Sequence, residues 1–253
     1  MSPAADPPPL AGRIALVTGA TRGIGRASAV ALAEAGAHVI AVGRTQGSLE
    51  ELDDEIAALG RHRPTLVPLD LRDGDGIDTL GYEVFQRHKR LDILVHAAAM
   101  LGGLWPVSHI APDHWEEIIA VNVSAAYRLI RSFEPLLRQS EAARAIFLTT
   151  GQGVRSRAFW GGYAATKSAL DTLVRCWADE VEHTSIRAVI LDPGVMRTRM
   201  RAEAFPGEDP ATLVDPAEIG PMIVAYAAAP DLGLPHEAVR FRDWQAARAT
   251  ASA

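Results

Sequence analysis

A glycine-rich turn between a predicted strand and a predicted helix constrains this chain more than any other feature. Arg13–Thr18 has the apolar composition of a buried strand, and Gly23–Ala35 is an Ala- and Leu-rich helix pattern. The segment that joins them is Thr18-Gly19-Ala20-Thr21-Arg22-Gly23-Ile24-Gly25. Glycines there make the turn tight and let the backbone approach a pyrophosphate, which the helix N-terminus attracts. The turn therefore predicts a dinucleotide site at the end of the first strand.

Strand and helix patterns alternate along the rest of the chain. Further strands are predicted at Ala37–Val42, Thr65–Leu69, Leu91–His96, Ala145–Thr149 and Ile186–Leu191. Further helices are predicted at Ser48–Leu59, Asp75–His88, Pro112–Leu137 and Tyr163–His183. This alternation predicts an α/β fold of the Rossmann type: a doubly wound, mainly parallel sheet with helices on both faces. We expect a disordered N-terminal tail over residues 1–11 and a single dinucleotide-binding catalytic domain over residues 12–253.

Composition narrows the class of protein. With 253 residues and 48% hydrophobic residues, the chain can bury a full core. A net charge of −6 disfavours a nucleic-acid partner, which needs clustered cations. Cys176 is the single cysteine, so it forms no intrachain disulfide, and we expect it to be a buried small apolar residue. No targeting signal and no apolar run of roughly 18 residues is found. We therefore expect a cytoplasmic protein without a membrane partner, and no metal site is predicted.

A tyrosine and a lysine open the helix predicted at Tyr163–His183. They stand in Tyr163-Ala164-Ala165-Thr166-Lys167, four residues apart and thus on one helix face. A phenol with a pKa of about 10 is a poor catalyst, but a nearby ammonium favours its ionised form. Taken alone, such a pair is also typical of a solvated helix surface. With the glycine turn, which resembles the pattern TGxxxGIG, it resembles the YxxxK motif of the short-chain dehydrogenase/reductase family.

The resemblance implies four catalytic residues. Tyr163 corresponds to the family's acid–base residue, and Lys167 to the lysine that tunes it. Asn122 corresponds to an asparagine that holds a water for proton relay, although an isolated Asn is also a common backbone hydrogen-bonder. The family's serine is replaced by Thr150, with Thr149 as the alternative. A threonine keeps the hydroxyl, but its methyl group narrows the pocket.

The end of the second predicted strand distinguishes between the nicotinamide cofactors. A carboxylate there binds the ribose hydroxyls and repels a 2′-phosphate, whereas this sequence has Val42-Gly43-Arg44-Thr45. Arg44, and Arg22 in the glycine turn, match a phosphate, so NADP(H) is predicted over NAD(H). The alternative is that both arginines are solvated loop residues. By resemblance, the cofactor-binding residues are Gly19, Thr21, Arg22, Gly23, Ile24, Gly25, Arg44, Asp70, Leu71, Ala97, Tyr163, Lys167, Pro193, Gly194, Val195 and Thr198.

Two further segments bear on the resemblance. His96-Ala97-Ala98-Ala99 departs from the family's NNAG, and a structural role is predicted for His96. Arg199–Pro216 stands where the family has its mobile substrate lid. This lid and Asp215–Ile219 resemble a bacterial oxoacyl-carrier-protein reductase-like subgroup. The family's long helices imply a homodimer or homotetramer.

The resemblance implies an NADP(H)-dependent oxidoreductase that transfers a hydride between nicotinamide and a small-molecule carbonyl or alcohol. The alternatives are an NAD-dependent alcohol or hydroxysteroid dehydrogenase and a catalytically decayed NADP-binding sensor. Arg155 and Arg157 either attract an acidic carrier or lie in a solvated loop. The candidate pocket residues, each of which core packing would also explain, are Met100, Leu101, Trp105, Phe159, Trp160, Met196 and Met200.

Overall fold

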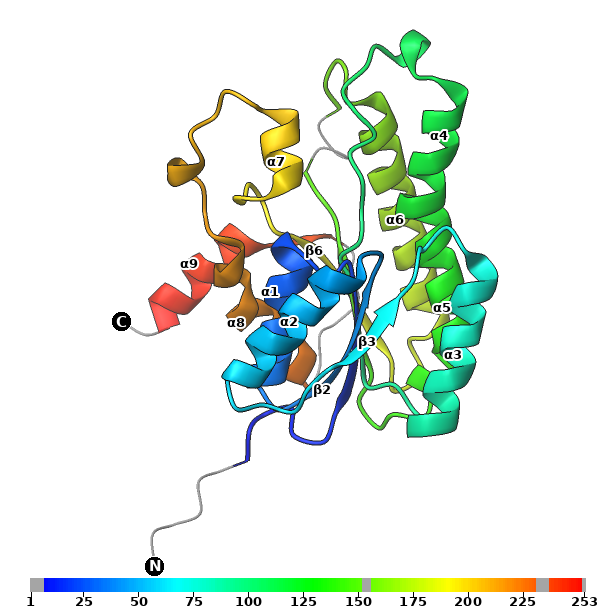
Figure 1. The fold of residues 1–253 in the computed structure, drawn as a ribbon, viewed down its shortest axis with the longest axis vertical. Coiled ribbons are helices and arrows are strands. Elements are labelled where there is room, and N and C mark those ends of the chain that lie inside the picture. The colour runs from blue at the N-terminus through cyan, green and yellow to red at the C-terminus, as the bar shows by residue number, and fades with distance from the viewer. Residues whose placement is uncertain (1–6, 152–155, 231–236, 252–253) are drawn as a thin grey trace, which may run out of the picture.

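A parallel sheet of seven strands runs through the part of the chain that the structure describes, which is residues 7–151, 156–230 and 237–251 of a computed structural model. The strand order is β3-β2-β1-β4-β5-β6-β7, so the chain winds outward from β1 in both directions (Figure 1). The strands are β1 (Ile14–Thr18), β2 (His38–Gly43), β3 (Thr65–Pro68), β4 (Ile93–His96), β5 (Arg144–Leu148), β6 (Arg187–Asp192) and β7 (Val239–Arg240). The predicted Rossmann-type fold is confirmed.

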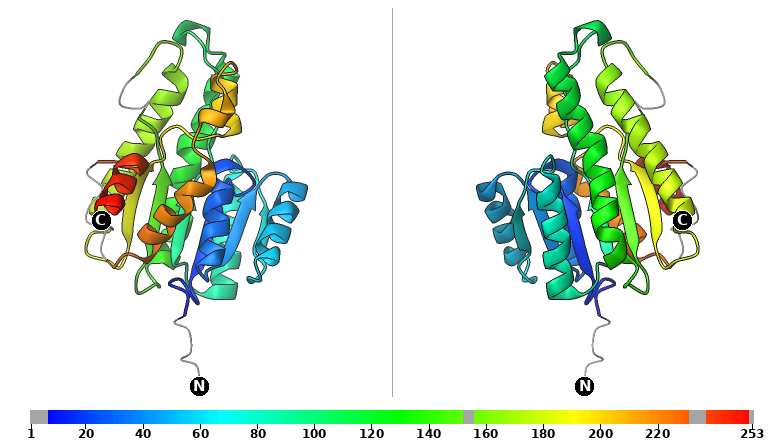
Figure 2. Two further views of the ribbon diagram at one scale, coloured as in Figure 1. Left: turned by 90° about the vertical axis from the view of Figure 1, so that its left-hand side faces the viewer. Right: turned by 90° about the vertical axis from the view of Figure 1, so that its right-hand side faces the viewer.

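Helices cover both faces of this sheet, as the two side views in Figure 2 show. On one face lie α1 (Gly23–Glu34), α2 (Gln46–Ala58) and α8 (Gly220–Ala228). On the other lie α3 (Gly74–His88), α5 (Ala125–Leu137) and α6 (Gly161–Glu180). The remaining elements are η1 (Val107–His109), α4 (Pro112–Ile119), η2 (Ala120–Ser124), α7 (Arg199–Ala204), η3 (Pro210–Thr212), η4 (Pro216–Ile219) and α9 (Phe241–Ala251). None of the described helices is long and apolar enough to cross a membrane.

The predicted helix Pro112–Leu137 is not uniform. It consists of α4, a π-helical turn at η2 and α5. A π turn inserts one residue into the regular hydrogen-bond ladder, and such turns frequently mark functional sites. Asn122 lies in the middle of η2 and is fully buried. The interruption therefore falls on a residue that the sequence singled out.

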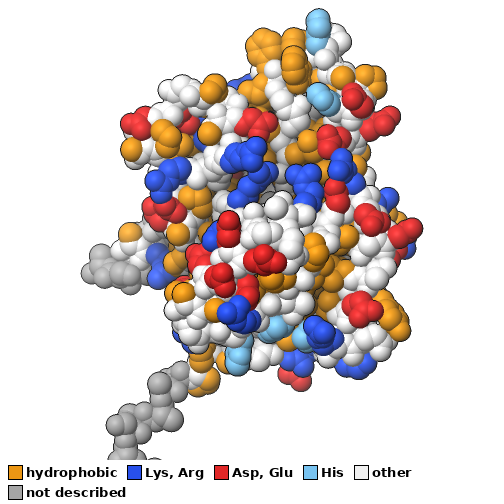
Figure 3. Space-filling view, viewed as in Figure 1, with side chains coloured by type: hydrophobic (Ala, Val, Ile, Leu, Met, Phe, Trp, Pro, Cys, Tyr) orange, Lys and Arg blue, Asp and Glu red, His pale blue; other side chains and the backbone are white. Residues whose placement is uncertain are grey.

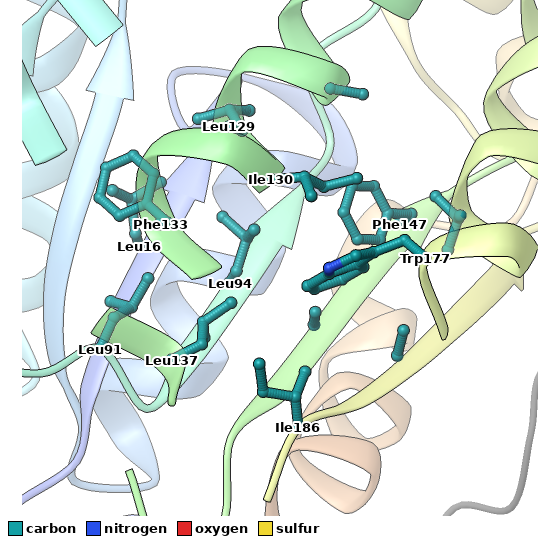
Figure 4. Packing of buried hydrophobic residues seen from close by; sticks show 14 of the residues in the cluster. Leu16, Leu91, Leu94, Leu129, Ile130, Phe133, Leu137, Phe147, Trp177 and Ile186 are labelled. Atoms are coloured by element: carbon teal, nitrogen blue, oxygen red, sulfur yellow. The ribbon is translucent and has the colours of Figure 1, made fainter. Parts of the chain in front are cut away.

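Apolar side chains fill the space between the sheet and the helices on each face. Between the sheet and α5 and α6, Phe133, Phe147 and Trp177 anchor one cluster (Figure 4). The rings of Phe147 and Trp177 meet edge to face, with centroids 6.1 Å apart, which is a favourable aromatic geometry. The Trp177 Nε1–H donates to Glu134 Oε2 at 2.8 Å, so its polar atom is satisfied. This packing holds α6, which carries the tyrosine–lysine pair, firmly on the sheet.

Two predictions about individual positions are wrong. Leu10 does not belong to the disordered tail predicted for residues 1–11, because it is fully buried and its N–H donates to the Ala35 carbonyl at 2.9 Å. Cys176 was expected to be buried, but it is exposed on α6. Val174 and Trp177 lie on the buried face of α6, and the helical spacing therefore places Cys176 on the solvent-exposed face.

Candidate active site

A cavity of about 980 Å³ lies at the carboxyl ends of the strands. It extends from the glycine turn and Arg44 to Tyr163 and Lys167. Parallel sheets of this kind bind ligands in that position, because their loops converge there. All sixteen residues predicted to bind the cofactor line this cavity, and so do Thr149 and Thr150. Residues that are far apart in the sequence are thus brought together at one site.

The glycine turn is packed so tightly that side chains do not fit. A Cβ on Gly25 would lie 2.1 Å from the Gly19 carbonyl oxygen, far closer than atoms can approach. Gly19 has a positive φ of 67°, and a Cβ there would lie 2.9 Å from Ala98 Cα. The turn is therefore a bare backbone cradle at the N-terminus of α1. That arrangement fits the pyrophosphate of a dinucleotide, whose charge the free N–H groups of the first helical turn attract.

The tyrosine–lysine pair is buried at the other end of the cavity. The exposed fractions of Tyr163 and Lys167 are 8% and 3%. Lys167 Nζ donates to the Leu148 carbonyl at 2.8 Å and lies 6.0 Å from the centroid of the Tyr163 ring. The alternative of a solvated helix surface is therefore wrong.

Burial also dominates the protonation of this pair. It lowers the pKa of Lys167 to about 8, although the nearby Asp171 carboxylate opposes the change. It raises the pKa of Tyr163, and the charge of Asp192 adds to the effect. The ammonium was expected to lower the pKa of the Tyr163 phenol, but desolvation has the larger effect and raises it. At neutral pH Tyr163 is a protonated group that can donate.

Asn122 does not line the cavity but supports its wall. Its Oδ1 accepts from the Met100 N–H at 2.9 Å, and its Nδ2 donates to the Met100 carbonyl at 2.9 Å and to Thr166 Oγ1 at 3.0 Å. These bonds tie the loop after β4 to helix α6. The predicted role of Asn122 in holding a relay water stays a prediction.

The two threonines at the end of β5 both face the site. Thr149 is 5% exposed, and among the described residues its Oγ1 has no hydrogen-bond partner. Thr150 is less buried and lines the same cavity. Both positions offer a hydroxyl, so the assignment of Thr150 in place of the family's serine stays a prediction.

Comparison with known proteins decides the family. A family profile described as short chain dehydrogenase matches residues 13–209. The chain belongs to the short chain dehydrogenase family. The uncharacterized oxidoreductase YciK of Escherichia coli K12 is 38% identical over 212 residues, which are 83% of this chain and 84% of that protein.

Solved structures of short chain dehydrogenases agree with this family membership. One from Pseudomonas syringae has a TM-score of 0.89 and 37% identity, covering 94% of this chain and 97% of the other. Another, from Escherichia coli CFT073 in complex with NADPH, has a TM-score of 0.83 and 37% identity, covering 88% and 93%. The chain is thus an oxidoreductase of this family, and relatives that bind NADPH support NADP(H) binding.

Two polar residues of this short chain dehydrogenase have structural partners. His96 is buried, its Nδ1 lies 2.9 Å from Thr18 Oγ1, and burial lowers its pKa to about 3. It is therefore neutral and supports the loop after β1, in agreement with its predicted structural role. Asp70 lines the cavity but accepts from Arg72 Nη2 at 2.6 Å, and that bond lowers the pKa of its carboxyl. Its predicted contact with the cofactor stays a prediction.

The walls of the site in this dehydrogenase carry both apolar and basic side chains. Of the candidate pocket residues, Met100, Leu101, Trp160, Met196 and Met200 line the cavity. Trp105 and Phe159 do not, since both are exposed outside it. Basic side chains gather across the middle of the face shown in Figure 3. The arginines that line the cavity are Arg22, Arg44, Arg157, Arg175, Arg199, Arg201, Arg240 and Arg242. Arg155 lies outside the described residues.

Sequence reasoning missed the inner part of the site. Asp171 and Arg175 follow Lys167 on α6 and line the same cavity. Their spacing of four residues places both on the face that carries Lys167, so extending the tyrosine–lysine pattern would have found them. On the opposite wall, Arg199–Ala204 forms α7, and Met200 packs against the cluster around Tyr163. The mobility expected of this segment stays a prediction.

Proposed function

We propose that the protein is an NADP(H)-dependent carbonyl reductase in which Tyr163 is the proton donor. The observation that carries the proposal is the burial of Tyr163 and Lys167 in the cavity that begins at the glycine turn. A neutral phenol at that place suits protonation of a carbonyl oxygen. The NADPH complex of the relative from Escherichia coli CFT073 supports the choice of cofactor.

Each residue of the site has a separate role in this reaction. When bound, the reduced nicotinamide supplies a hydride to the carbonyl carbon. The Tyr163 hydroxyl donates its proton to the carbonyl oxygen as negative charge develops there. The Thr150 hydroxyl polarises the same oxygen. The charged Lys167 ammonium stabilises the tyrosinate that remains, because a nearby positive charge favours the ionised phenol. A proton from Lys167, replaced from solvent, then restores the Tyr163 hydroxyl.

The backbone of the glycine turn and the residues after β6 would hold the cofactor. The turn would bind the pyrophosphate, and Arg44 with Arg22 would bind a 2′-phosphate, because both are exposed at the cavity and can present a bidentate fork. After β6, Thr198 lies against the same turn, and its Cγ2 would be 3.3 Å from a Cβ placed on Gly23. It would contact the nicotinamide end together with Val195.

We expect Arg44→Ala to weaken NADPH binding by about 10- to 100-fold, which is the effect of one charge-assisted hydrogen bond of about 1.5–3 kcal/mol. NADH affinity should change little, because NADH has no phosphate at that position. Fluorescence titration of both nucleotides measures the effect. Arg63→Ala is the matched control, since Arg63 is paired with Asp53 and lies outside the cavity lining. Equal affinities of the natural chain for NADPH and NADH would contradict the 2′-phosphate assignment.

An aromatic wall supports an apolar carbonyl substrate. The Trp160 ring lies 6.1 Å from the Tyr163 ring and 5.8 Å from the Phe205 ring, centroid to centroid. Met100 and Met200 pack against the same cluster. Apolar and aromatic surfaces beside a proton donor favour ketones or aldehydes that carry rings or alkyl groups.

We expect Trp160→Ala to lower kcat/KM by about tenfold for an aromatic ketone and far less for a small aldehyde, because only the larger substrate reaches the ring. Loss of NADPH absorbance with each substrate measures this. Phe159→Ala serves as the control, because the Phe159 ring is adjacent to Trp160 in the sequence but is exposed outside the cavity. A loss of equal size for both substrates would contradict this role of Trp160.

A substrate screen would identify the carbonyl compounds that the protein reduces. Ketones, quinones, aldehydes and 3-oxoacyl thioesters cover the chemistry that the site accepts. Activity with the thioesters alone would assign the chain to the oxoacyl-carrier-protein reductase-like subgroup.

We also propose a homodimer or homotetramer in the cytoplasm, since α5 and α6 are the helices through which family members usually associate.

A further inference from the structure

Helix α6 stacks four polar side chains in a row along the cavity. Tyr163, Lys167, Asp171 and Arg175 follow one another at intervals of four residues, and all four line the cavity. Asp171 is buried, with an exposed fraction of 4%. A carboxyl buried one helical turn from a buried lysine, on the same face, acts on that lysine through low-dielectric surroundings.

We propose that Asp171 is a positioning residue for proton transfer, whose carboxylate keeps Lys167 charged inside the cavity. The inference rests on the proposed function in one respect: a charged Lys167 is useful because it supports Tyr163. Asp171 itself touches neither the tyrosine nor a reacting atom in this arrangement. Its effect passes through the ammonium.

The surroundings of Lys167 leave Asp171 as its main counter-charge. The ammonium donates to the Leu148 carbonyl, which is neutral, and His96 on β4 is neutral because of its lowered pKa. Asp192 at the end of β6 acts on Tyr163 and Asp171. Asp171 is the group that raises the pKa of Lys167 against the effect of burial. Without it, desolvation would drive the lysine toward its neutral form.

The Asp171 carboxylate makes a long ion pair with Arg175. Among the described residues, its Oδ1 has no hydrogen-bond partner, and its Oδ2 lies 3.9 Å from Arg175 Nη2. Burial raises the pKa of the Asp171 carboxyl, and the nearby Thr149 hydroxyl opposes that change, although its Oγ1 makes no hydrogen bond of normal geometry. The pair with Arg175 is long, and the carboxylate also acts on Lys167, one helical turn away.

The sign of the effect follows from these charges. Lys167 has a pKa of about 8 with Asp171 in place. Removal of the negative charge takes away the one influence that raises this pKa, so Lys167 would lose its proton at a lower pH. The alkaline limb of the activity profile, where the ammonium is lost, should move in the same direction.

The test uses an unusual property of the sequence: it contains two lysines, Lys89 and Lys167. Full-length protein labelled with ¹³Cε-lysine gives two side-chain signals, and Lys89→Arg assigns them. In Asp171→Asn, which keeps the shape of the side chain, we expect the titration midpoint of Lys167 to fall by about one pH unit. Asp171→Glu should restore it, and Asp179→Asn, an exposed position on the same helix, should leave it unchanged.

Two readouts separate this inference from the proposed function. The NMR titration needs no substrate, so it tests the role of Asp171 independently of the reaction. A protein that reduces no carbonyl would overturn the proposed function, and the NMR result would still decide the Asp171 inference. Where a carbonyl is reduced, the alkaline limb of kcat/KM should shift with the NMR midpoint. An unchanged Lys167 midpoint in Asp171→Asn with native circular dichroism overturns the inference. Asp171→Ser, smaller and uncharged, gives the same test if the asparagine variant does not fold.

Discussion

Tyr163→Phe should reduce kcat/KM for NADPH-dependent carbonyl reduction by about 10²–10⁴-fold, the range that a general acid contributes. The substitution removes the hydroxyl that donates the proton and keeps the ring that packs against Trp160. NADPH affinity should therefore remain within a small factor of the natural value. Stopped-flow absorbance at the nicotinamide band and a fluorescence titration measure the two quantities on the same preparation.

A second tyrosine provides the control for this result. Tyr82 is 61% exposed on α3 and lies outside the cavity lining, so Tyr82→Phe should retain full activity. Undiminished turnover in Tyr163→Phe would show that the proton donor has been misassigned. A parallel loss of NADPH binding would show that the hydroxyl serves the cofactor instead of the carbonyl.

Gly25→Ala should have the largest effect on stability and on cofactor binding together. The added methyl group would lie 2.1 Å from the Gly19 carbonyl oxygen, so the turn or the start of α1 must shift. Overpacking of this kind costs about 3 kcal/mol, which corresponds to a decrease in Tm of about 6–12 °C for a chain of this size. A turn that has moved no longer presents its N–H groups to the pyrophosphate, so NADPH binding should be lost.

Gly47 provides a control that shows whether the effect is specific to Gly25. Gly47 stands in the first turn of α2, where an added Cβ would meet no atom within 4 Å. Gly47→Ala should leave the free energy of unfolding unchanged or raise it by up to about 1 kcal/mol. Thermal unfolding with and without NADPH compares the two variants. A Gly25→Ala protein with natural Tm and NADPH affinity would contradict the cradle described here.

The first six strands of the sheet were predictable because each carries its own signal, whereas the two-residue strand β7 was not predicted. Apolar runs of five or six residues stand out in β1, β2, β5 and β6, and the predicted bounds differ from the observed ones by at most one residue. The π turn at η2 carries no such local signal. It depends on the bonds of Asn122 to Met100 and Thr166, which are contacts between elements distant in the sequence.

The site was predictable as a set of positions but not in its electrostatics. Motif spacing located Tyr163 and Lys167, and the fold brings both to the cavity. The dominance of burial over the neighbouring charge depends on how α6 packs on the sheet, which spacing does not contain. Asp171 was overlooked because the motif stops at the lysine. The exposure of Cys176 likewise depends on which face of α6 meets β5.

The clamp that Asn122 places on Met100 has a consequence for altering selectivity. Two backbone bonds and the bond to Thr166 fix the loop after β4 to helix α6, so a change in that wall would disturb α6. The opposite wall, on α7, rests on side-chain packing and on the pairing of Arg201 with Glu208. Libraries aimed at new ketones should therefore vary Met200 and Ala204 and leave the Met100 loop untouched.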